Sequence, residues 1–149
     1  MTDLAGFSGL VRRDHGLSVV STLRADGTIQ SSVVNAGVLA HPVTGMPVIG
    51  FTTRRGTAKL ANLRTRPRAS IVVRAGWEWA AAEGPASLAG PDDPMPGVDA
   101  NALRVLLRDV FTAAGGTHED WARYDAVMAE EGRAAVLLAP ERLYSNPVE

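Results

Sequence analysis

Cysteine is absent from the 149-residue sequence. Its absence excludes a disulfide framework, a thiolate metal site and a cysteine nucleophile. Long apolar runs are absent as well, since none approaches the roughly 20 residues of a membrane-spanning helix. Residues 1–10 lack the basic region and the long apolar region of a signal peptide. We therefore expect a cytoplasmic protein that does not associate with a membrane.

Histidine is scarce and scattered. His15, His41 and His118 form no i,i+4 pair and have no carboxylate at ligand spacing, so we expect no metal site. The sequence also lacks Gly-x-Ser-x-Gly, a Walker loop and Gly-x-Gly-x-x-Gly, which leaves hydrolase, NTPase and Rossmann functions without support. Tyr144 is a candidate proton donor, although a tyrosine on a terminal strand more often packs. The sequence therefore identifies no catalytic residue.

Acidic residues are missing from residues 28–77, whereas seven basic residues lie there. The net charge of the whole chain is −1, so the remainder carries −8, because +7 and −8 give −1. A positive band on a nearly neutral chain predicts an anionic ligand of limited size. The same balance argues against nucleic-acid binding, which usually needs a basic domain.

Length and composition, with 46% apolar and 21% charged residues, predict one globular domain over residues 1–149. Apolar patterning predicts strands over residues 17–24, 28–40, 48–53, 69–75, 77–82 and 134–139. Helices are expected over 6–14 and 57–66, and in two segments between 100 and 130. The early hairpins and about six short strands favour a mainly β fold, an antiparallel barrel with flanking helices.

Three positions within these elements have expected local roles. Gly37, inside a strand pattern, indicates a bulge or a close backbone approach. Thr57 is the expected N-cap of the helix that ends before Pro67. Thr117, three residues before Asp120, begins an approximate capping box for the second late helix.

Residues 51–59 are the most informative segment, because a strand there delivers hydroxyl and basic side chains into a helix N-terminus. The first N–H groups of a helix are unpaired and its dipole is positive there, so a phosphate fits. Gly56 lets the backbone approach a ligand, Lys59 adds a point charge, and Arg55 adds a forked contact. The alternative is a solvated basic turn whose threonine only caps the helix, and the residues alone leave both possibilities open.

The sequence of residues 52–70, Thr-Thr-Arg-Arg-Gly-Thr-Ala-Lys-Leu-Ala-Asn-Leu-Arg-Thr-Arg-Pro-Arg-Ala-Ser, resembles the phosphate-binding signature of the pyridoxamine-phosphate-oxidase-like split barrels. It is more closely similar to the flavin/deazaflavin oxidoreductases of actinobacterial type. Residues 77–84 and 118–128 agree with the same family, and the resemblance extends over about residues 15–145.

This resemblance implies an FMN-binding split β-barrel that forms a homodimer, with a flavin-type cofactor at the subunit interface. Members use either FMN or the deazaflavin coenzyme F420. The overall match and the Arg-, Ala- and Gly-rich composition favour F420, with FMN as the alternative. Tetrapyrrole or cofactor binding without turnover is a further alternative, because one fold hosts several functions.

By position, the resemblance assigns the phosphate to Lys59, Arg55 and Thr57, and the edge of the ring to Thr52 and Thr53. The strand before them lies beside the ring, and two tryptophans wall the pocket from the same or the partner subunit. The full set of implied cofactor contacts is Ser32, Val33, Val34, Thr52, Thr53, Arg54, Arg55, Thr57, Ala58, Lys59, Trp77 and Trp79.

Two departures from the family pattern limit what the resemblance implies. Some deazaflavin-binding relatives have a basic residue where this chain has Thr57, so Arg54 or Arg55 has to substitute. Residues 142–144 are Arg-Leu-Tyr rather than the Arg-Leu-His of true pyridoxamine phosphate oxidases, which argues against oxidation of vitamin B6.

The expected function is therefore an oxidoreductase that uses reduced F420 as hydride donor to a small unsaturated or quinone-like substrate. In such enzymes the cofactor carries the difficult chemistry, which agrees with the absence of an acid–base constellation from the sequence.

Overall fold

The Asp26-Gly27 turn folds the first two strands into a hairpin. The Asp26 carboxylate accepts hydrogen bonds from the backbone N–H of Thr28 at 3.0 Å and from its hydroxyl at 2.6 Å. Gly27 has a φ of 85°, a left-handed value that glycine adopts without strain. The turn chemistry therefore accounts for the antiparallel start of the fold.

The computed structural model describes residues 3–146, and residues 1, 2 and 147–149 of the expected domain lie outside the described residues. The helices are α1 Leu4–Arg13, α2 Ala58–Thr65, α3 Ala100–Ala113 and α4 Trp121–Glu130. The strands are β1 Leu17–Leu23, β2 Ile29–Asn35, β3 Gly37–Ala40, β4 Pro47–Thr53, β5 Arg68–Ala75, β6 Glu78–Ala89, β7 Ala134–Leu138 and β8 Arg142–Ser145.

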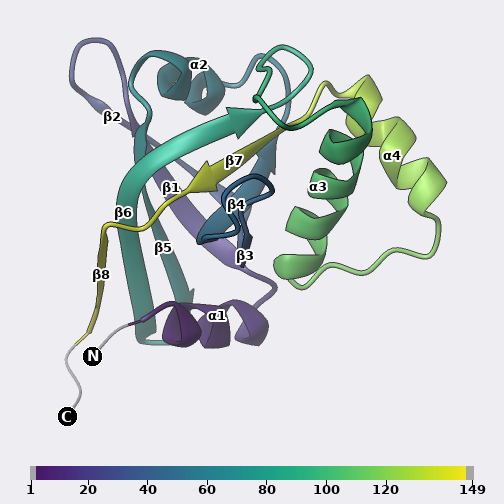
Figure 1. Cartoon of the computed structure of the whole chain (residues 1–149). Helices are drawn as coiled ribbons and strands as arrows, with labels where there is room; N and C mark the ends of the chain where they lie inside the picture. The colour runs from purple at the N-terminus through teal and green to yellow at the C-terminus, as the bar shows by residue number, and fades with distance from the viewer. Residues whose placement is uncertain (1–2, 147–149) are drawn as a thin grey trace.

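All strand pairs in the described part of the chain are antiparallel, in the order β2-β1-β5-β6-β7-β4-β3, with β8 added to β6. The long strand β6 joins the two halves of the sheet. Its residues 78–85 pair with β5, and its residues 86–89 pair with β7. Figure 1 shows β6 curving through the molecule, so that the two halves wrap around a shared interior.

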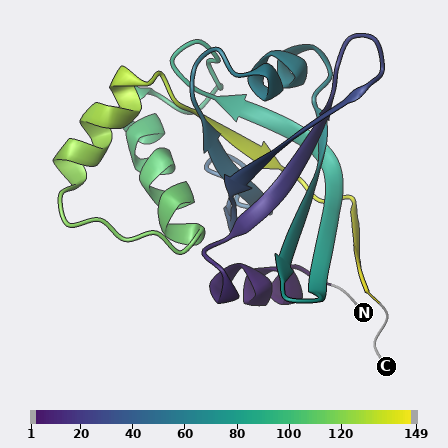
Figure 2. The ribbon, with the colours of Figure 1, turned by 180° about the vertical axis from the view of Figure 1, so that it is seen from behind.

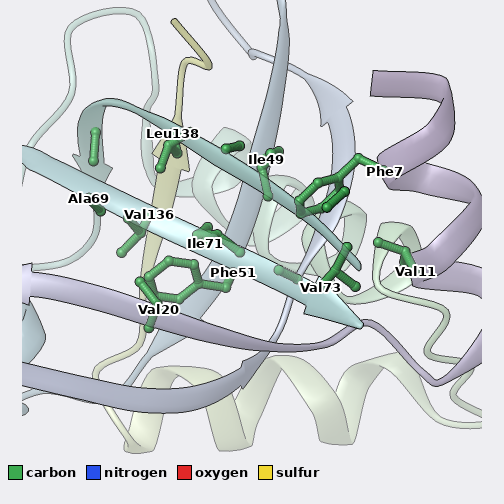
Figure 3. Close-up of a cluster of buried hydrophobic side chains, with 14 of the residues drawn as sticks. Phe7, Val11, Val20, Ile49, Phe51, Ala69, Ile71, Val73, Val136 and Leu138 are labelled. Carbon is green, nitrogen blue, oxygen red and sulfur yellow. The ribbon is translucent and has the colours of Figure 1, made fainter. Parts of the chain in front are cut away.

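The main core fills the space between the two halves of the sheet, as Figure 3 shows. Phe51 on β4, Ile71 on β5 and Val136 on β7 are fully buried there. Phe7 and Val11 of α1 close one end of this core. In Figure 1, α1 lies at the lower end of the barrel and α2 at the upper end.

Helices α3 and α4 lie together beside the β3–β4–β7 half, as both ribbon views show (Figures 1 and 2). A Cβ atom added to Gly37 would lie 2.2 Å from the carbonyl carbon of Ala113, so the backbone of β3 touches the end of α3. The close approach expected at Gly37 is therefore confirmed. Among residues 3–146, no helix combines the length and the apolar character needed to cross a bilayer.

The structure confirms the mainly β fold, but several expectations about its elements are wrong. The strand expected over residues 77–82 extends over 78–89, because its second half pairs with β7, and residues 142–145 form a further strand that pairs with β6. The strand expected over residues 28–40 is two strands, because the N–H of Ala36 leaves the ladder and donates to the carbonyl of Gly16 at 2.9 Å. This turn sends β2 to one half of the sheet and β3 to the other. Helix α4 begins after Asp120 rather than at Thr117, because the Asp120 carboxylate accepts from the N–H of Arg123.

Candidate functional site

A cavity of about 490 Å³ lies between the barrel and the helix pair α3–α4. It is lined by residues of β2, of β4 and the start of α2, of the end of α3, and of α4 and the residue before β7. The lining residues are His15, Val33, Val34, Asn35, Thr52, Thr53, Arg54, Thr57, Lys59, Val110, Phe111, Ala114, Gly115, Gly116, Tyr124, Met128 and Arg133.

The α2 end of this cavity is cationic. Arg54, Lys59 and Arg133 border it, and none of the described residues that line it is acidic. Burial, followed by the positive charges of Arg133 and Arg54, lowers the pKa of Lys59 from its ordinary value of 10.5. A depressed lysine pKa among like charges marks a place where an added anion is favourable.

One carboxylate offsets part of this charge from outside the cavity. Glu131 accepts from Nε of Arg133 at 3.1 Å and lies 3.9 Å from Nη1 of Arg54. Arg133 also donates from Nη1 to the hydroxyl of Thr52 at 3.3 Å. Among residues 3–146, no carboxylate forms an ion pair with Lys59. Lys59 is thus the cation at this site that has the least compensation.

The N-terminus of α2 opens beside these charges. Thr57 occupies the N-cap position with extended backbone, but its side chain makes no capping hydrogen bond. Its hydroxyl is instead 2.7 Å from the hydroxyl of Thr53. The first N–H groups of α2 are therefore left without a side-chain acceptor, as an anion-binding helix terminus requires.

Strand β2 forms the apolar wall of the cavity. Val33 and Val34 border it, and Val33 is 66% exposed. One residue earlier, the Ser32 hydroxyl is buried without a hydrogen-bond partner among the described residues. A buried hydroxyl that lacks a hydrogen-bond partner destabilises the fold unless a ligand or a water molecule supplies that partner.

The other end of the cavity lies where α1 meets β1. His15 follows α1 and has a φ of 57°, and its carbonyl accepts from the side-chain amide of Asn35 at 2.8 Å. The Phe111 ring packs closely against Gly116, where an added Cβ would lie 2.5 Å from the ring atom Cζ. Tyr124 donates its hydroxyl to the Leu107 carbonyl at 2.8 Å, and burial raises its pKa to about 12.

The structure brings together more than half of the residues that the sequence singled out. Those that border the cavity are Val33, Val34, Thr52, Thr53, Arg54, Thr57 and Lys59. Ser32 lies beside its wall.

The other four candidates lie elsewhere in this chain. Arg55 turns away and pairs with Asp92, with Nε 2.7 Å from Oδ2. Ala58 is exposed at the start of α2. Trp77 is 93% exposed in the β5–β6 turn, and Trp79 packs edge-on against Tyr144 with ring centroids 6.1 Å apart. A contribution of these tryptophans from a partner subunit stays a prediction.

Sequence reasoning missed Arg133, the cation that comes from outside the basic segment. The register of β4 and β7 pairs Thr53 with Ala134, which places Arg133 beside Arg54. No local motif marks Arg133, since it follows an ordinary helix end. Only knowledge that β7 pairs with β4 would have placed this arginine at the site.

The fold and the cavity together define an antiparallel split-barrel protein with a cavity that is cationic at its α2 end. No family model matches the chain. Solved structures with the same fold include a conserved hypothetical protein from Mycobacterium tuberculosis, at 19% identity and a TM-score of 0.69, with 97% of this chain and 84% of that chain covered.

Two other similar structures have names that indicate a ligand or an activity. A pyridoxamine 5'-phosphate oxidase-related, FMN binding protein from Nostoc punctiforme is 14% identical, with a TM-score of 0.67 and 95% of this chain and 81% of that chain covered. An F420 reductase is 15% identical, with a TM-score of 0.61 and 97% and 98% covered. At these identities the similarity establishes the fold, which is the antiparallel split barrel of these proteins.

Proposed function

We propose that this protein is an oxidoreductase that binds coenzyme F420 and transfers a hydride to a small unsaturated or quinone-like substrate. The observation that carries the proposal is the cationic, acid-free end of the cavity at the uncapped N-terminus of α2. An elongated ligand with an anionic group at one end and a flat apolar body suits this cavity.

The phosphate of the cofactor would lie against Lys59, Thr57 and Arg54. Three features support this placement: the Lys59 ammonium has no carboxylate partner among the described residues, the first turn of α2 has no side-chain cap, and Arg54 borders the cavity. A bound phosphate would receive backbone and ammonium hydrogen bonds together. It would also raise the pKa of Lys59 again, because it reverses the local charge.

The ring system would lie along β2 and β4. Val33 and Val34 add apolar side chains to the lining, one from each face of β2, and Thr52 offers a hydroxyl that accepts from Arg133. The Ser32 hydroxyl, buried without a partner among residues 3–146, fits a polar atom at the edge of such a ring. When bound in its reduced form, the cofactor supplies a hydride, and the chain supplies binding and orientation.

The choice between F420 and FMN rests on the resemblance of residues 52–70 to deazaflavin oxidoreductases. Neighbours of the same fold are named for each ligand, an F420 reductase and an FMN binding protein. FMN dependence is therefore the second candidate. Binding of either cofactor without turnover is the third, because the fold does not fix the function.

The test is a side-by-side titration of the purified protein with F420 and with FMN, followed by fluorescence. We expect saturable binding of F420 that is tighter than that of FMN. Lys59→Ala should weaken F420 binding by about tenfold, the loss of one charge-assisted contact. Arg12→Ala, an exposed change on α1 at the far end of the barrel, is the matched control. Tighter binding of FMN would move the protein to the flavin branch, and binding of neither would overturn the proposal.

We also propose that the protein forms a homodimer through the outer face of β1 and β2. Apolar side chains in register cover that face, with Val19 opposite Val33 and Leu23 opposite Ile29. All four are more than 40% exposed, at 43%, 66%, 42% and 64% respectively. An apolar sheet face of this kind favours association. Because Val33 also lines the cavity, a partner on this face would border the site.

Light scattering on Val19→Asp tests the dimer. The charge should convert a dimer to a monomer and weaken cofactor binding, because the partner would no longer border the cavity. Val43→Asp places the same charge on an exposed turn away from this face. A wild-type protein that is monomeric at micromolar concentration would contradict this proposal.

A further inference from the structure

We propose that His15 is the catalytic proton donor of the reaction, the group that protonates the substrate when it accepts the hydride. The inference rests on the proposed function and adds to it a residue that neither the sequence pattern nor the named neighbours single out. It follows from which side chains border the cavity and which of them have a proton to give.

The protic side chains of the cavity are few, and most are engaged elsewhere. The Tyr124 hydroxyl donates to the Leu107 carbonyl, and with a pKa of about 12 it does not ionise near neutrality. The hydroxyls of Thr53 and Thr57 bind each other.

The other polar side chains of the cavity are poorer proton donors. The hydroxyl of Thr52 accepts from Arg133, and the Asn35 amide donates to the His15 carbonyl, but an aliphatic hydroxyl and an amide are both far weaker acids than an imidazolium. The three cations belong to the anion end of the cavity. His15 is the one side chain among the lining residues whose type exchanges a proton between about pH 5 and 8.

Tyr144, the proton donor that the sequence suggests, lies outside the cavity lining. Its hydroxyl donates to the Glu83 carboxylate, and this hydrogen bond, together with burial, raises its pKa. A phenol bound in this way keeps its proton, so the candidate donor moves from β8 to the α1–β1 junction.

The backbone at His15 is held in an uncommon conformation. Its φ of 57° is left-handed, a region in which non-glycine residues are uncommon. The Asn35 amide binds the His15 carbonyl at 2.8 Å. A Cβ on the next residue, Gly16, would lie 2.4 Å from the Ala36 carbonyl oxygen, so the chain is closely enclosed there. The Gly16 N–H donates to the Val11 carbonyl at 2.9 Å, the hydrogen bond of a helix end whose last residue is left-handed, so the end of α1 fixes the position of His15.

The position of His15 along the cavity also suits a donor. It directly follows α1, whereas the cationic end lies at the start of α2, and Figure 1 shows these helices at opposite ends of the barrel. A ligand with its phosphate at α2 extends its ring toward His15. The acceptor stacked on that ring would then be within reach of the imidazole rather than of the cations.

The proposed step is balanced for an α,β-unsaturated ketone. The hydride from the reduced deazaflavin or flavin forms a C–H bond at the β-carbon, and the C=C π pair moves to the α-carbon. The imidazolium N–H of His15 breaks and its proton forms the second C–H bond there. The product is the saturated ketone, the cofactor leaves oxidised by two electrons, and the neutral imidazole regains a proton from water.

The first test needs no turnover. In ¹H–¹⁵N spectra of the imidazoles, assigned with His41→Gln and His118→Gln, oxidised F420 and FMN are added separately, and inorganic phosphate serves as the anion control. We expect the better-binding cofactor to shift the His15 signals and phosphate to leave them in place. Unchanged His15 signals at saturating cofactor would overturn the inference, whereas failure of both cofactors to bind would overturn the proposed function instead.

The second test is the single-turnover oxidation of reduced cofactor by 2-cyclohexen-1-one. His15→Gln keeps a hydrogen-bonding side chain but cannot give up a proton, so its rate should fall at least about 100-fold, as for loss of a general acid. Cofactor affinity should stay within threefold of wild type. His41→Gln, outside the cavity lining, should react as the wild type does.

The pH profile separates proton donation from a structural role. The wild-type rate should fall as the pH rises through the imidazole range, and His15→Gln should lose this dependence. The charged groups of the same cavity are Arg54, Lys59 and Arg133, with Asp14 adjacent in sequence. The pKa of Lys59 is lowered, but Lys59 is present in both proteins, so a pH dependence that comes from Lys59 would persist in His15→Gln. A His15→Gln protein with wild-type rate and profile would overturn the inference.

Discussion

The four helices within residues 3–146 begin in two different ways. An aspartate caps α1, α3 and α4, where Asp3, Asp99 and Asp120 accept from backbone N–H groups at 2.8, 2.8 and 3.1 Å. Helix α2 begins at Thr57, whose side chain makes no capping bond. Three helix termini are thus closed with a carboxylate, and the one at the cavity is left open and surrounded by cations.

This difference separates the helix termini that contribute to stability from the one that is suited to bind an anion. A carboxylate cap satisfies an N–H group and opposes the positive end of the helix dipole. Cations near that end have the opposite effect, so the start of α2 is electrostatically unfavourable in the absence of a ligand. An anion that binds there gains the interactions that the other helices obtain from aspartate.

The basic residues between positions 54 and 64 divide in the same way into paired and unpaired charges. Arg55 and Arg64 pair with Asp92 and Asp93 of the loop after β6, at 2.7 and 2.8 Å. The two pairs hold the loop against α2 and against the turn before it, and they neutralise the charges of both arginines. Lys59, by contrast, has no such partner among the described residues.

The largest expected effect comes from giving α2 the cap that the other helices have. Thr57→Asp should raise the Kd for the cofactor at least about 100-fold, roughly 2.7 kcal/mol, because its carboxylate occupies the N–H groups and repels the phosphate. The melting temperature of the ligand-free protein should not fall, since the helix gains a cap. Fluorescence titration and calorimetry measure the two effects.

Thr44→Asp adds the same charge on the exposed turn before β4 and serves as the control, because an aspartate there can still accept from the Met46 N–H as Thr44 does. Unchanged affinity in Thr57→Asp would show that the cofactor does not use this terminus.

The second prediction concerns the uncompensated charge of Lys59. Its pKa is lowered in the folded protein, so protonated Lys59 opposes folding below that pKa, and the penalty is relieved as pH rises toward 10.5. Lys59→Met should therefore raise the melting temperature of the ligand-free protein at pH 7, with a gain that shrinks in alkali. The same variant should bind cofactor about tenfold more weakly.

Affinity of the wild type should also fall as the pH rises through the lowered pKa of Lys59, because the anion binds the protonated form. Titrations at several pH values between 7 and 10.5 check this, with Lys59→Met as the variant whose affinity should lose the dependence. A variant that melts below wild type at pH 7 would contradict the assigned electrostatics.

The sequence predicted much of this arrangement because its signals are local. The Asp26-Gly27 hairpin and the helix that ends before Pro67 depend on residues within a few positions of each other. Gly37 was singled out by its place in a strand pattern, although the residue that it approaches, Ala113, is distant in the sequence. The basic segment was likewise located from local signals. Its placement on a strand-to-helix junction follows from alternation and a helix start signal.

The missed features depend on contacts between distant segments. Arg133 reaches the cavity through β4–β7 pairing, and His15 reaches it because Asn35 and Gly16 fix the turn after α1. Arg55 has a partner, Asp92, that is 37 positions away. No periodicity or motif encodes such contacts, so the sequence identified the segment but not which of its arginines faces the ligand.

The third prediction concerns α3, a helix whose N-terminus is capped by an aspartate. Asp99→Ala should destabilise the protein by about 1 kcal/mol, because it removes the cap of α3. For a chain of this size, that change corresponds to about 2–4 °C in melting temperature. Cofactor affinity should stay within twofold of wild type, since Asp99 is not among the residues that line the cavity. A large loss of affinity would mean that α3 shapes the site more than its cap suggests.

The smallest effect distinguishes two adjacent arginines, Arg54 and Arg55. Arg54 borders the cavity, whereas Arg55 is committed to Asp92 in an exposed ion pair worth about 0.2–1 kcal/mol. Arg55→Ala should therefore change cofactor affinity less than threefold and stability only slightly, whereas Arg54→Ala should weaken affinity severalfold. Parallel titrations of both variants give the comparison. If Arg55→Ala has the larger effect on affinity, Arg55 leaves Asp92 to bind the ligand, and the loop after β6 takes part in binding.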